Sequence, residues 1–317
     1  METLLLLSAA FVAFTNGANA NSKGVASLYG TGTTSLRTAL WWGTASTFLG
    51  SVCAVFLSGG MIKAFSGQGI VANELLKTPH FLTAVAAGAA LTSFMGTRFG
   101  FPVSTTHALV GALIGAGYAG SPNGVQLHAL WDRFLFPLLF SPAIAILLGA
   151  VCYWLLRLLR LAPDHRTRPL DVMHFLSTGA ASFARGLNDT PKMAALLVMI
   201  PWIEARSAII GVAVMIAVGG LLDSRNVAET LAKKVTGMNP GQGFASSLVT
   251  ACLVATASLH SMPASTTHVS VGSLVGMGAS TRQARWRKIA EIMMAWISTV
   301  PCGAILAAVL YWMVRWI

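Results

Sequence analysis

Long apolar stretches, separated by short polar connections, follow one another along the whole chain. An apolar helix of about 17 to 25 residues is long enough to cross the hydrocarbon core of a bilayer. The pattern predicts ten membrane segments of this kind, five in each half of the sequence. They are expected near residues 3–20, 38–62, 80–97, 103–118 and 134–160, and then near 175–200, 207–222, 243–262, 264–279 and 289–317. The predicted fold class is therefore an all-α polytopic membrane protein.

The same tetrapeptide, Ser-Thr-Thr-His, lies inside two of these apolar stretches. It occupies residues 104–107 and 265–268, each time two positions after a proline and just before a glycine-rich apolar run. Proline is typical of the start of a helix. Both segments are short for a full span, so we expect some of them to be re-entrant hairpins. The two copies place six hydroxyl donors within the membrane, namely Ser104, Thr105, Thr106, Ser265, Thr266 and Thr267.

A second motif also occurs twice, upstream of each copy of the first. Residues 17–23 and 186–192 share Gly, Asn and Lys at identical spacing. We expect each Gly-x-Asn to interrupt its helix, which would leave free backbone N–H groups and a positive helix end inside the protein. The apolar stretch 4–14 with Ala18-Asn19-Ala20 behind it resembles a signal peptide. We interpret it as the first membrane segment, because cleavage would remove a repeated motif.

The repeated motifs divide the chain into a first repeat, 1–160, a cytoplasmic connector, 161–173, and a second repeat, 174–317. Five segments per half is an odd number, so the second repeat enters the membrane from the side on which the first one ended. The two repeats are therefore predicted to be inverted. Inverted repeats with glycine- or proline-interrupted segments are typical of secondary transporters, whose substrate site lies near the midplane where the halves meet.

Composition agrees with a bilayer environment, since 55% of the residues are hydrophobic, 10% are charged and the mean hydropathy is +0.69. The net charge of +11 does not indicate nucleic-acid binding, because no aromatic-basic module or soluble domain would carry it. It is better explained by basic loops that face the anionic membrane lipids of the inner leaflet. The arginine-rich stretches 157–168 and 282–288 are thus predicted to be cytoplasmic, and both termini external. The predicted location is the plasma (inner) membrane, with multiple passes.

Several kinds of chemistry are not indicated. Each of the four cysteines is isolated within an apolar stretch, so neither a zinc site nor a thiol redox motif is expected. The sequence has no phosphate-binding loop for ATP. Ser104 or Ser265 with its neighbouring histidine would need a third triad member to act as a hydrolase, and none is evident. We therefore predict no enzyme activity, no metal site and no cofactor, and transport energy drawn from an ion gradient.

The repeated lysines carry the strongest chemical signal. A lysine at the centre of a membrane helix costs about 2.5–3.5 kcal/mol, so a pair of them, Lys23 and Lys192, indicates an anionic partner. Together with the hydroxyls they would form a cage for one small tetrahedral oxyanion. Two alternatives stay open: the hydroxyls can bond back to their own helices, and Lys23 can extend to the interface. His107 and His268 are expected to be hydrogen-bonded structural residues.

In these motifs the chain resembles the inorganic phosphate transporter (PiT) family of secondary carriers. That family repeats Gly-Ala-Asn-Asp in inverted halves. It carries Pro-Val-Ser-Thr-Thr-His after this motif, as at residues 102–107 here and, with one change, at 263–268. The resemblance covers both halves of the chain. It implies that Asn19, Asn188, Asp189 and the two hydroxyl triplets contact the anion or a coupled cation.

The chain also departs from the family pattern. Ala20 stands where the family has its first aspartate, and Lys23 and Lys192 stand where it usually has asparagine. With one carboxylate lost and two ammonium groups gained, the chain is similar to the divergent branch of the family that includes sulfate permeases. The resemblance thus implies ion-coupled symport of phosphate or sulfate, with H⁺ or Na⁺ as the ion. Asp189 is the only acidic residue in either copy of the first motif, so we expect it to be the coupling residue, which binds a cation or carries the proton, unless it only neutralises Lys192. A gated anion channel with the same cage is the alternative, and a homodimer is left open.

Overall fold

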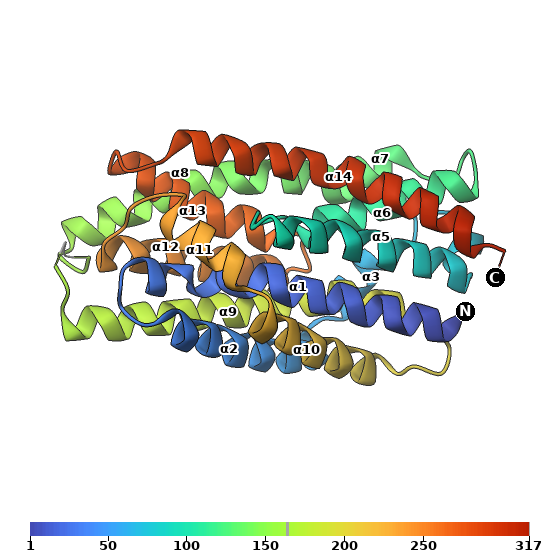
Figure 1. Ribbon diagram of the computed structural model, residues 1–317, viewed down its shortest axis with the longest axis horizontal. Coiled ribbons are helices and arrows are strands. Elements are labelled where there is room, and N and C mark those ends of the chain that lie inside the picture. Colours follow the sequence, from blue (N-terminus) through green and yellow to red (C-terminus); the bar gives the residue numbers. More distant parts are fainter. Residues whose placement is uncertain (163–164, 317) are drawn as a thin grey trace.

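The computed structural model describes residues 1–162 and 165–316. Within these ranges the regular elements are helices, most of which run along the long axis of the molecule (Figure 1). The first part of the chain forms α1 (Glu2–Gly30), α2 (Leu36–Leu57), α3 (Gly59–Phe65), α4 (Asn73–Leu76), α5 (Pro79–Arg98), α6 (Thr105–Gly120), α7 (Leu127–Leu130), the π-helical turn η1 (Trp131–Leu135) and α8 (Phe136–Leu158). The second part forms α9 (Arg168–Leu197), α10 (Ala205–Leu222), α11 (Arg225–Lys233), α12 (Pro240–Leu259), α13 (Thr266–Ser280) and α14 (Trp286–Val314).

The ten expected apolar segments fall mainly on these helices, although α1 extends well beyond the predicted end at residue 20. In the described part of the chain, six helical stretches are long and apolar enough to cross a membrane, namely α1, α2, α7 to α8, α10, α12 and α14. The long helix α9 is not one of them, and it carries Arg185, Asp189 and Lys192 in its interior. The chain is thus an all-helical, multi-pass membrane protein.

The predicted helix interruptions at Gly17 and Gly186 are wrong, because both motifs lie inside the unbroken helices α1 and α9. These glycines instead permit close packing. A Cβ atom on Gly17 would lie 2.0 Å from the carbonyl oxygen of Ile216 in α10, and one on Gly186 would lie 2.1 Å from that of Thr47 in α2. Small residues allow membrane helices to approach in this way. Because α1 and α9 continue through both Gly-x-Asn motifs, neither motif provides a free helix end.

Two hairpins, α5–α6 and α12–α13, bring their bends to the middle of the molecule. Figure 1 shows α5 and α6 in the right half of the bundle and α12 and α13 in the left half. Each bend leads into a helix through a capping serine: Ser104 Oγ accepts a hydrogen bond from the His107 amide, and Ser265 Oγ accepts one from the His268 amide, both at 3.2 Å. Such N-caps fix where α6 and α13 begin.

Contacts between early and late helices hold the molecule together. Helix α1 packs against α10, α2 against α9, α6 against α14, and α8 against α13. Each of these pairs joins a helix that ends by residue 158 to one that begins at or after residue 168, so the two parts of the chain interdigitate. The α8–α9 connection and the start of α14 lie at one end of the bundle and both termini lie at the other (Figure 1). Residues 163 and 164 of the predicted connector, 161–173, lie outside the described residues.

Candidate functional site

The bends of the two hairpins touch at the centre of the bundle. Ser265 Oγ donates a hydrogen bond to Ser104 Oγ at 2.9 Å. The first turns of α6 and α13 therefore meet at this point. Amide groups in the first turn of a helix have no acceptor within the helix, and the N-terminal end of a helix carries partial positive charge. Two such ends in one place favour the binding of an anion.

Lys23 reaches this centre from α1. Its Nζ donates to Thr267 Oγ1 at 2.6 Å and to the carbonyl oxygen of Val103 at 2.8 Å. Thr267 belongs to α13, whereas Val103 belongs to the bend before α6, so one ammonium group joins both hairpins. Lys23 is buried, and its ammonium group ends on these two protein acceptors.

Lys192 makes the equivalent contacts from α9. Its Nζ donates to Thr106 Oγ1 at 2.9 Å and to the carbonyl oxygen of Ala264 at 2.8 Å. It also donates to Asn188 Oδ1 and, at 3.0 Å, to Asp189 Oδ1. Each lysine thus donates to a threonine from the other part of the chain.

The two motif asparagines tie the hairpins to the long helices. Asn19 Oδ1 accepts a hydrogen bond from the Val103 amide at 3.0 Å, and its Nδ2 donates to two acceptors on the same hairpin, one of which is Thr97 Oγ1 at 2.9 Å. Asn188 Nδ2 donates to Ser258 Oγ, on α12, at 3.0 Å. In this structure, then, Asn19 bonds to protein groups that shape the bend.

The remaining threonines of the two triplets are linked to the buried carboxylate, Thr266 directly and Thr105 through Asn16. Thr266 Oγ1 donates to Asp189 Oδ2 at 3.2 Å. Thr105 Oγ1 accepts a hydrogen bond from Asn16 Nδ2 at 3.1 Å, and the same Nδ2 lies 3.4 Å from Asp189 Oδ2. The eleven residues predicted from the sequence, together with Asn16, are therefore connected directly or through the hairpin bends.

Arg185 was missed in the sequence. It precedes the glycine of the second motif, in the position that Asn16 holds in the first motif. Its Nη1 donates to Asn16 Oδ1 at 3.4 Å and its Nη2 to Thr47 Oγ1 at 2.8 Å. Arg185 lies four residues before Asp189, and residues four apart lie on the same face of a helix. That spacing is the signal that could have identified it.

The charges at this centre do not balance. Lys23, Arg185, Lys192 and Asp189 are the only buried Lys, Arg, Asp and Glu side chains in residues 1–162 and 165–316. Three cations and one carboxylate give a net formal charge of +2. A buried charge is costly unless it is paired. The arrangement of ammonium, guanidinium and hydroxyl donors would therefore be stabilised by a small anion.

The two motif histidines lie beside this cluster and are hydrogen-bonded, as expected. His107 Nδ1 is 2.8 Å from Ser104 Oγ, and His268 Nδ1 is 3.2 Å from the carbonyl oxygen of Leu138. Their ring centroids are 4.5 Å apart, and the His268 ring also packs against Trp296. These contacts give both rings a packing role next to the serine caps.

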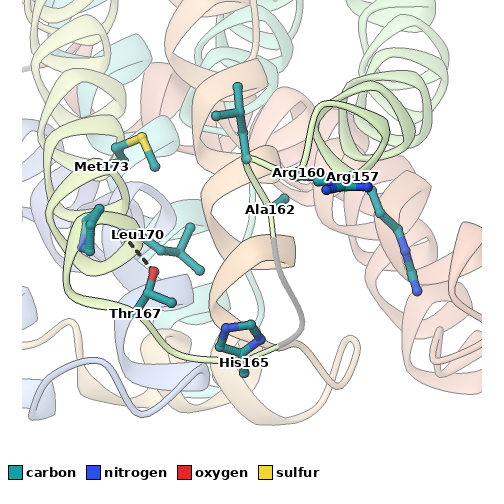
Figure 2. A pocket seen from close by; sticks show the side chains of 9 residues that line it. Arg157, Arg160, Ala162, His165, Thr167, Leu170 and Met173 are labelled. Atoms are coloured by element: carbon teal, nitrogen blue, oxygen red, sulfur yellow. Dashed lines mark hydrogen bonds between the residues drawn. The ribbon is translucent and has the colours of Figure 1, made fainter.

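A hollow at the α8–α9 connection lies apart from the motif residues. Figure 2 shows the side chains around it, among them Arg157, Arg160 and His165. Thr167 caps α9 there, with its Oγ1 accepting a hydrogen bond from the Leu170 amide at 3.3 Å. The hollow is part of the basic connection between the two halves, and no motif residue lines it.

Known proteins are similar to this chain over most of its length. The family model of the "Phosphate transporter family" matches residues 16–307. A protein of Rhizobium meliloti (strain 1021) named "Probable low-affinity inorganic phosphate transporter" is 28% identical over 325 residues, which cover 97% of this chain and 94% of that protein. A sulfate permease of Bacillus subtilis (strain 168) is 26% identical over 284 residues, covering 88% of this chain and 77% of the permease. A solved structure named "The sodium-dependent phosphate transporter" has a TM-score of 0.82 at 22% identity and covers 99% of both chains.

Proposed function

Because the chain belongs to the phosphate transporter family, we propose that it is a secondary active transporter of a small inorganic tetrahedral oxyanion, phosphate or sulfate. Its fold and relatives are those of transporters, not enzymes. The observation that carries the proposal is the buried group of donors with a net formal charge of +2 at the meeting of two hairpins. The names of the relatives support both anions, since one is a phosphate transporter and another a sulfate permease.

The anion would bind among groups that now bond to the protein. The ammonium groups of Lys23 and Lys192 point at the backbone carbonyls of Val103 and Ala264. An oxyanion that entered between the bends would replace these neutral acceptors with charged oxygens. An ammonium group that donates to an anionic oxygen gains the attraction of two opposite charges, which its bond to a neutral carbonyl lacks. Exchange of acceptors at both lysines would therefore favour the loaded state.

Inverted repeats would give this site alternating access. Support comes from the matching contacts of the two lysines and from the paired packing of α1 with α10 and α2 with α9. The two hairpins also occupy opposite halves of the bundle (Figure 1). We assign residues 1–160 and 174–317 to the two repeats. Because the lysines are buried, one hairpin must move before the anion can leave.

Asp189 is the residue that we assign to ion coupling. It is the one buried carboxylate in the described part of the chain. Coupling to sodium is supported by the similar solved structure, which is named as a sodium-dependent transporter. Coupling to a proton is supported by Ala20, which leaves the first motif without the carboxylate that a sodium site built around it would use. Both hypotheses place the coupling ion next to Lys192.

Uptake into proteoliposomes tests the proposal. Purified protein is reconstituted, and the uptake of labelled sulfate and labelled phosphate is measured with and without imposed sodium and proton gradients. We expect saturable uptake of at least one of the two anions, with accumulation above equilibrium when one gradient is present. Flux that never saturates and never exceeds equilibrium would identify a channel. No flux of either anion would reject an oxyanion transporter.

A further inference from the structure

We propose that Arg185 is the third cation of the oxyanion site and that it sets the preference of the site for a dianion. This inference rests on the proposed function and assigns a specificity-determining residue to it. Neither the repeated motifs nor their lysines include this arginine, since its counterpart in the first motif is Asn16. It is therefore a feature of the second half alone.

The position of Arg185 connects it to the substrate-facing groups. Its side chain is 2% exposed and lies between α9, α2 and α1. Nη1 donates to Asn16 Oδ1, and the amide nitrogen of the same Asn16 donates to Thr105 Oγ1 at 3.1 Å. The side chain of Asn16 thus links the guanidinium of Arg185 to the hydroxyl of Thr105.

The guanidinium also has an unused donor. Nε is buried and has no hydrogen-bond partner. Buried polar groups are nearly always hydrogen-bonded, so this unpaired N–H within a cluster of charged groups is a candidate donor to a bound ligand. The three hydrogen bonds of the nearby Asp189 carboxylate come from Lys192, Thr266 and Asn16. Arg185 is thus not the hydrogen-bonding partner of that carboxylate and keeps a donor for an additional acceptor.

Arg185 determines how much negative charge the site can hold. With it, the buried side chains carry a net formal charge of +2, which a dianion such as sulfate or monohydrogen phosphate would neutralise. Without Arg185 the net formal charge falls to +1, and a monoanion such as dihydrogen phosphate would be sufficient to neutralise it. The geometry thus assigns the discrimination between dianion and monoanion to a residue outside both repeated motifs.

The test uses Arg185→Gln, which removes the charge, and Arg185→Lys, which keeps the charge but lacks Nε and the planar fork. Arg98→Gln is the matched control, because Arg98 has a 57% exposed side chain and pairs with Asp223 at the surface. Each variant is reconstituted, and the KM for labelled sulfate and for labelled phosphate is measured over a series of pH values that spans the second ionisation of phosphate. Phosphate changes from monoanion to dianion over this series, whereas sulfate stays a dianion.

For Arg185→Gln we expect the KM of the transported dianion to rise by at least about tenfold, the effect of losing one charged hydrogen bond. Its KM for phosphate relative to wild type should grow as the pH rises, since the lost cation matters most to the dianion. Arg185→Lys should keep the wild-type pH trend with a smaller rise in KM, and Arg98→Gln should match wild type throughout.

A purely structural role gives a different result. If Arg185 only joins α9 to α2, both variants will lower the amount of folded protein and the Vmax, and the KM with its pH trend will stay at wild-type values. That outcome overturns the inference while leaving the proposed function intact. If Arg185→Gln does not fold, Arg185→Lys decides, because unchanged KM values for both anions contradict the assignment. Wild-type protein that transports neither anion would instead reject the proposed function.

Discussion

Lys23 and Lys192 hold equivalent positions but have different electrostatic surroundings. Lys192 Nζ lies 3.0 Å from the carboxylate of Asp189, and both side chains are buried. The hydrogen bonds of Lys23 go to a hydroxyl and a carbonyl, with no carboxylate among these partners. Removal of Lys192 therefore leaves a buried carboxylate without its main partner, whereas removal of Lys23 only lowers an excess of positive charge. The same substitution should have unequal effects at the two positions.

Replacement of each lysine by methionine separates binding from stability. Both Lys23→Met and Lys192→Met should weaken anion uptake, because each removes a charged donor from the site. Lys192→Met should also destabilise the fold by about 3 kcal/mol or more, the cost of breaking a buried ion pair. Thermal unfolding in detergent and uptake in proteoliposomes measure the two effects. Equal destabilisation in both variants, or normal uptake in both, would contradict this account.

Asp189→Asn tests coupling at the level of one side chain. If Asp189 carries the coupling proton, the variant should lose accumulation driven by a pH gradient but still exchange labelled for unlabelled anion, since exchange requires no net proton movement. If it binds sodium, accumulation driven by a sodium gradient should be lost in the same way. Both activities are measured in one set of proteoliposomes. A variant that accumulates anion like wild type on each gradient would show that Asp189 is not the coupling residue.

At the scale of helices, the motif glycines act through packing. Alanine at Gly17 or Gly186 would place a methyl group about 2 Å from a backbone carbonyl, and backbone cannot move aside as a flexible side chain can. We expect each substitution to lower thermal stability by about 1–3 kcal/mol, the usual effect of overpacking. Gly211→Ala in α10 is the control, because nothing lies within 4 Å of its added methyl group. Stability changes that are alike at all three positions would contradict the packing role.

These glycines also show where sequence reasoning about the helices succeeded and where it failed. The proline before each Ser-Thr-Thr-His predicted a nearby helix start, and α6 and α13 do begin just after it, at Thr105 and Thr266. The same local reasoning was wrong at Gly17, where glycine was interpreted as a helix break. Its actual partner, Ile216, lies far away in the sequence. A contact between distant helices has no local pattern that would reveal it.

The candidate site shows the same limit. Repetition identified Lys23, Lys192 and the hydroxyl triplets, and the structure brings these residues together. Repetition did not identify Arg185, because the equivalent residue of the first motif is Asn16, so the two positions do not match. Only the shared helix face and the hydrogen bond to Asn16 connect it to the rest. Asymmetric residues within a symmetric arrangement are therefore best found from the folded chain.

At the scale of the whole molecule, the proposed transport cycle predicts that the two bends separate. Ser104 and Ser265 touch through their hydroxyls at 2.9 Å, so Ser104→Cys with Ser265→Cys should form a disulfide on oxidation. The background for this pair lacks the native cysteines Cys53, Cys152, Cys252 and Cys302. Uptake should be abolished by an oxidant and restored by a reductant, and either single variant should be insensitive to both. Undiminished uptake in the cross-linked protein would show that the bends stay together during transport.

The interdigitation of the two halves also affects how the protein is made. Gly111 and Gly115 of α6 pack against the backbone of Val300 and Ala304 in α14. Lys23 Nζ donates a hydrogen bond to Thr267 Oγ1 of α13. A ribosome delivers these partners only when the chain is almost complete. Until then the helices of the first half lack one acceptor for the Lys23 ammonium, which keeps only the carbonyl of Val103, and one face of α6 stays uncovered. Such incomplete intermediates are vulnerable to misassembly, and the packing of α6 is completed only when α14 has been made.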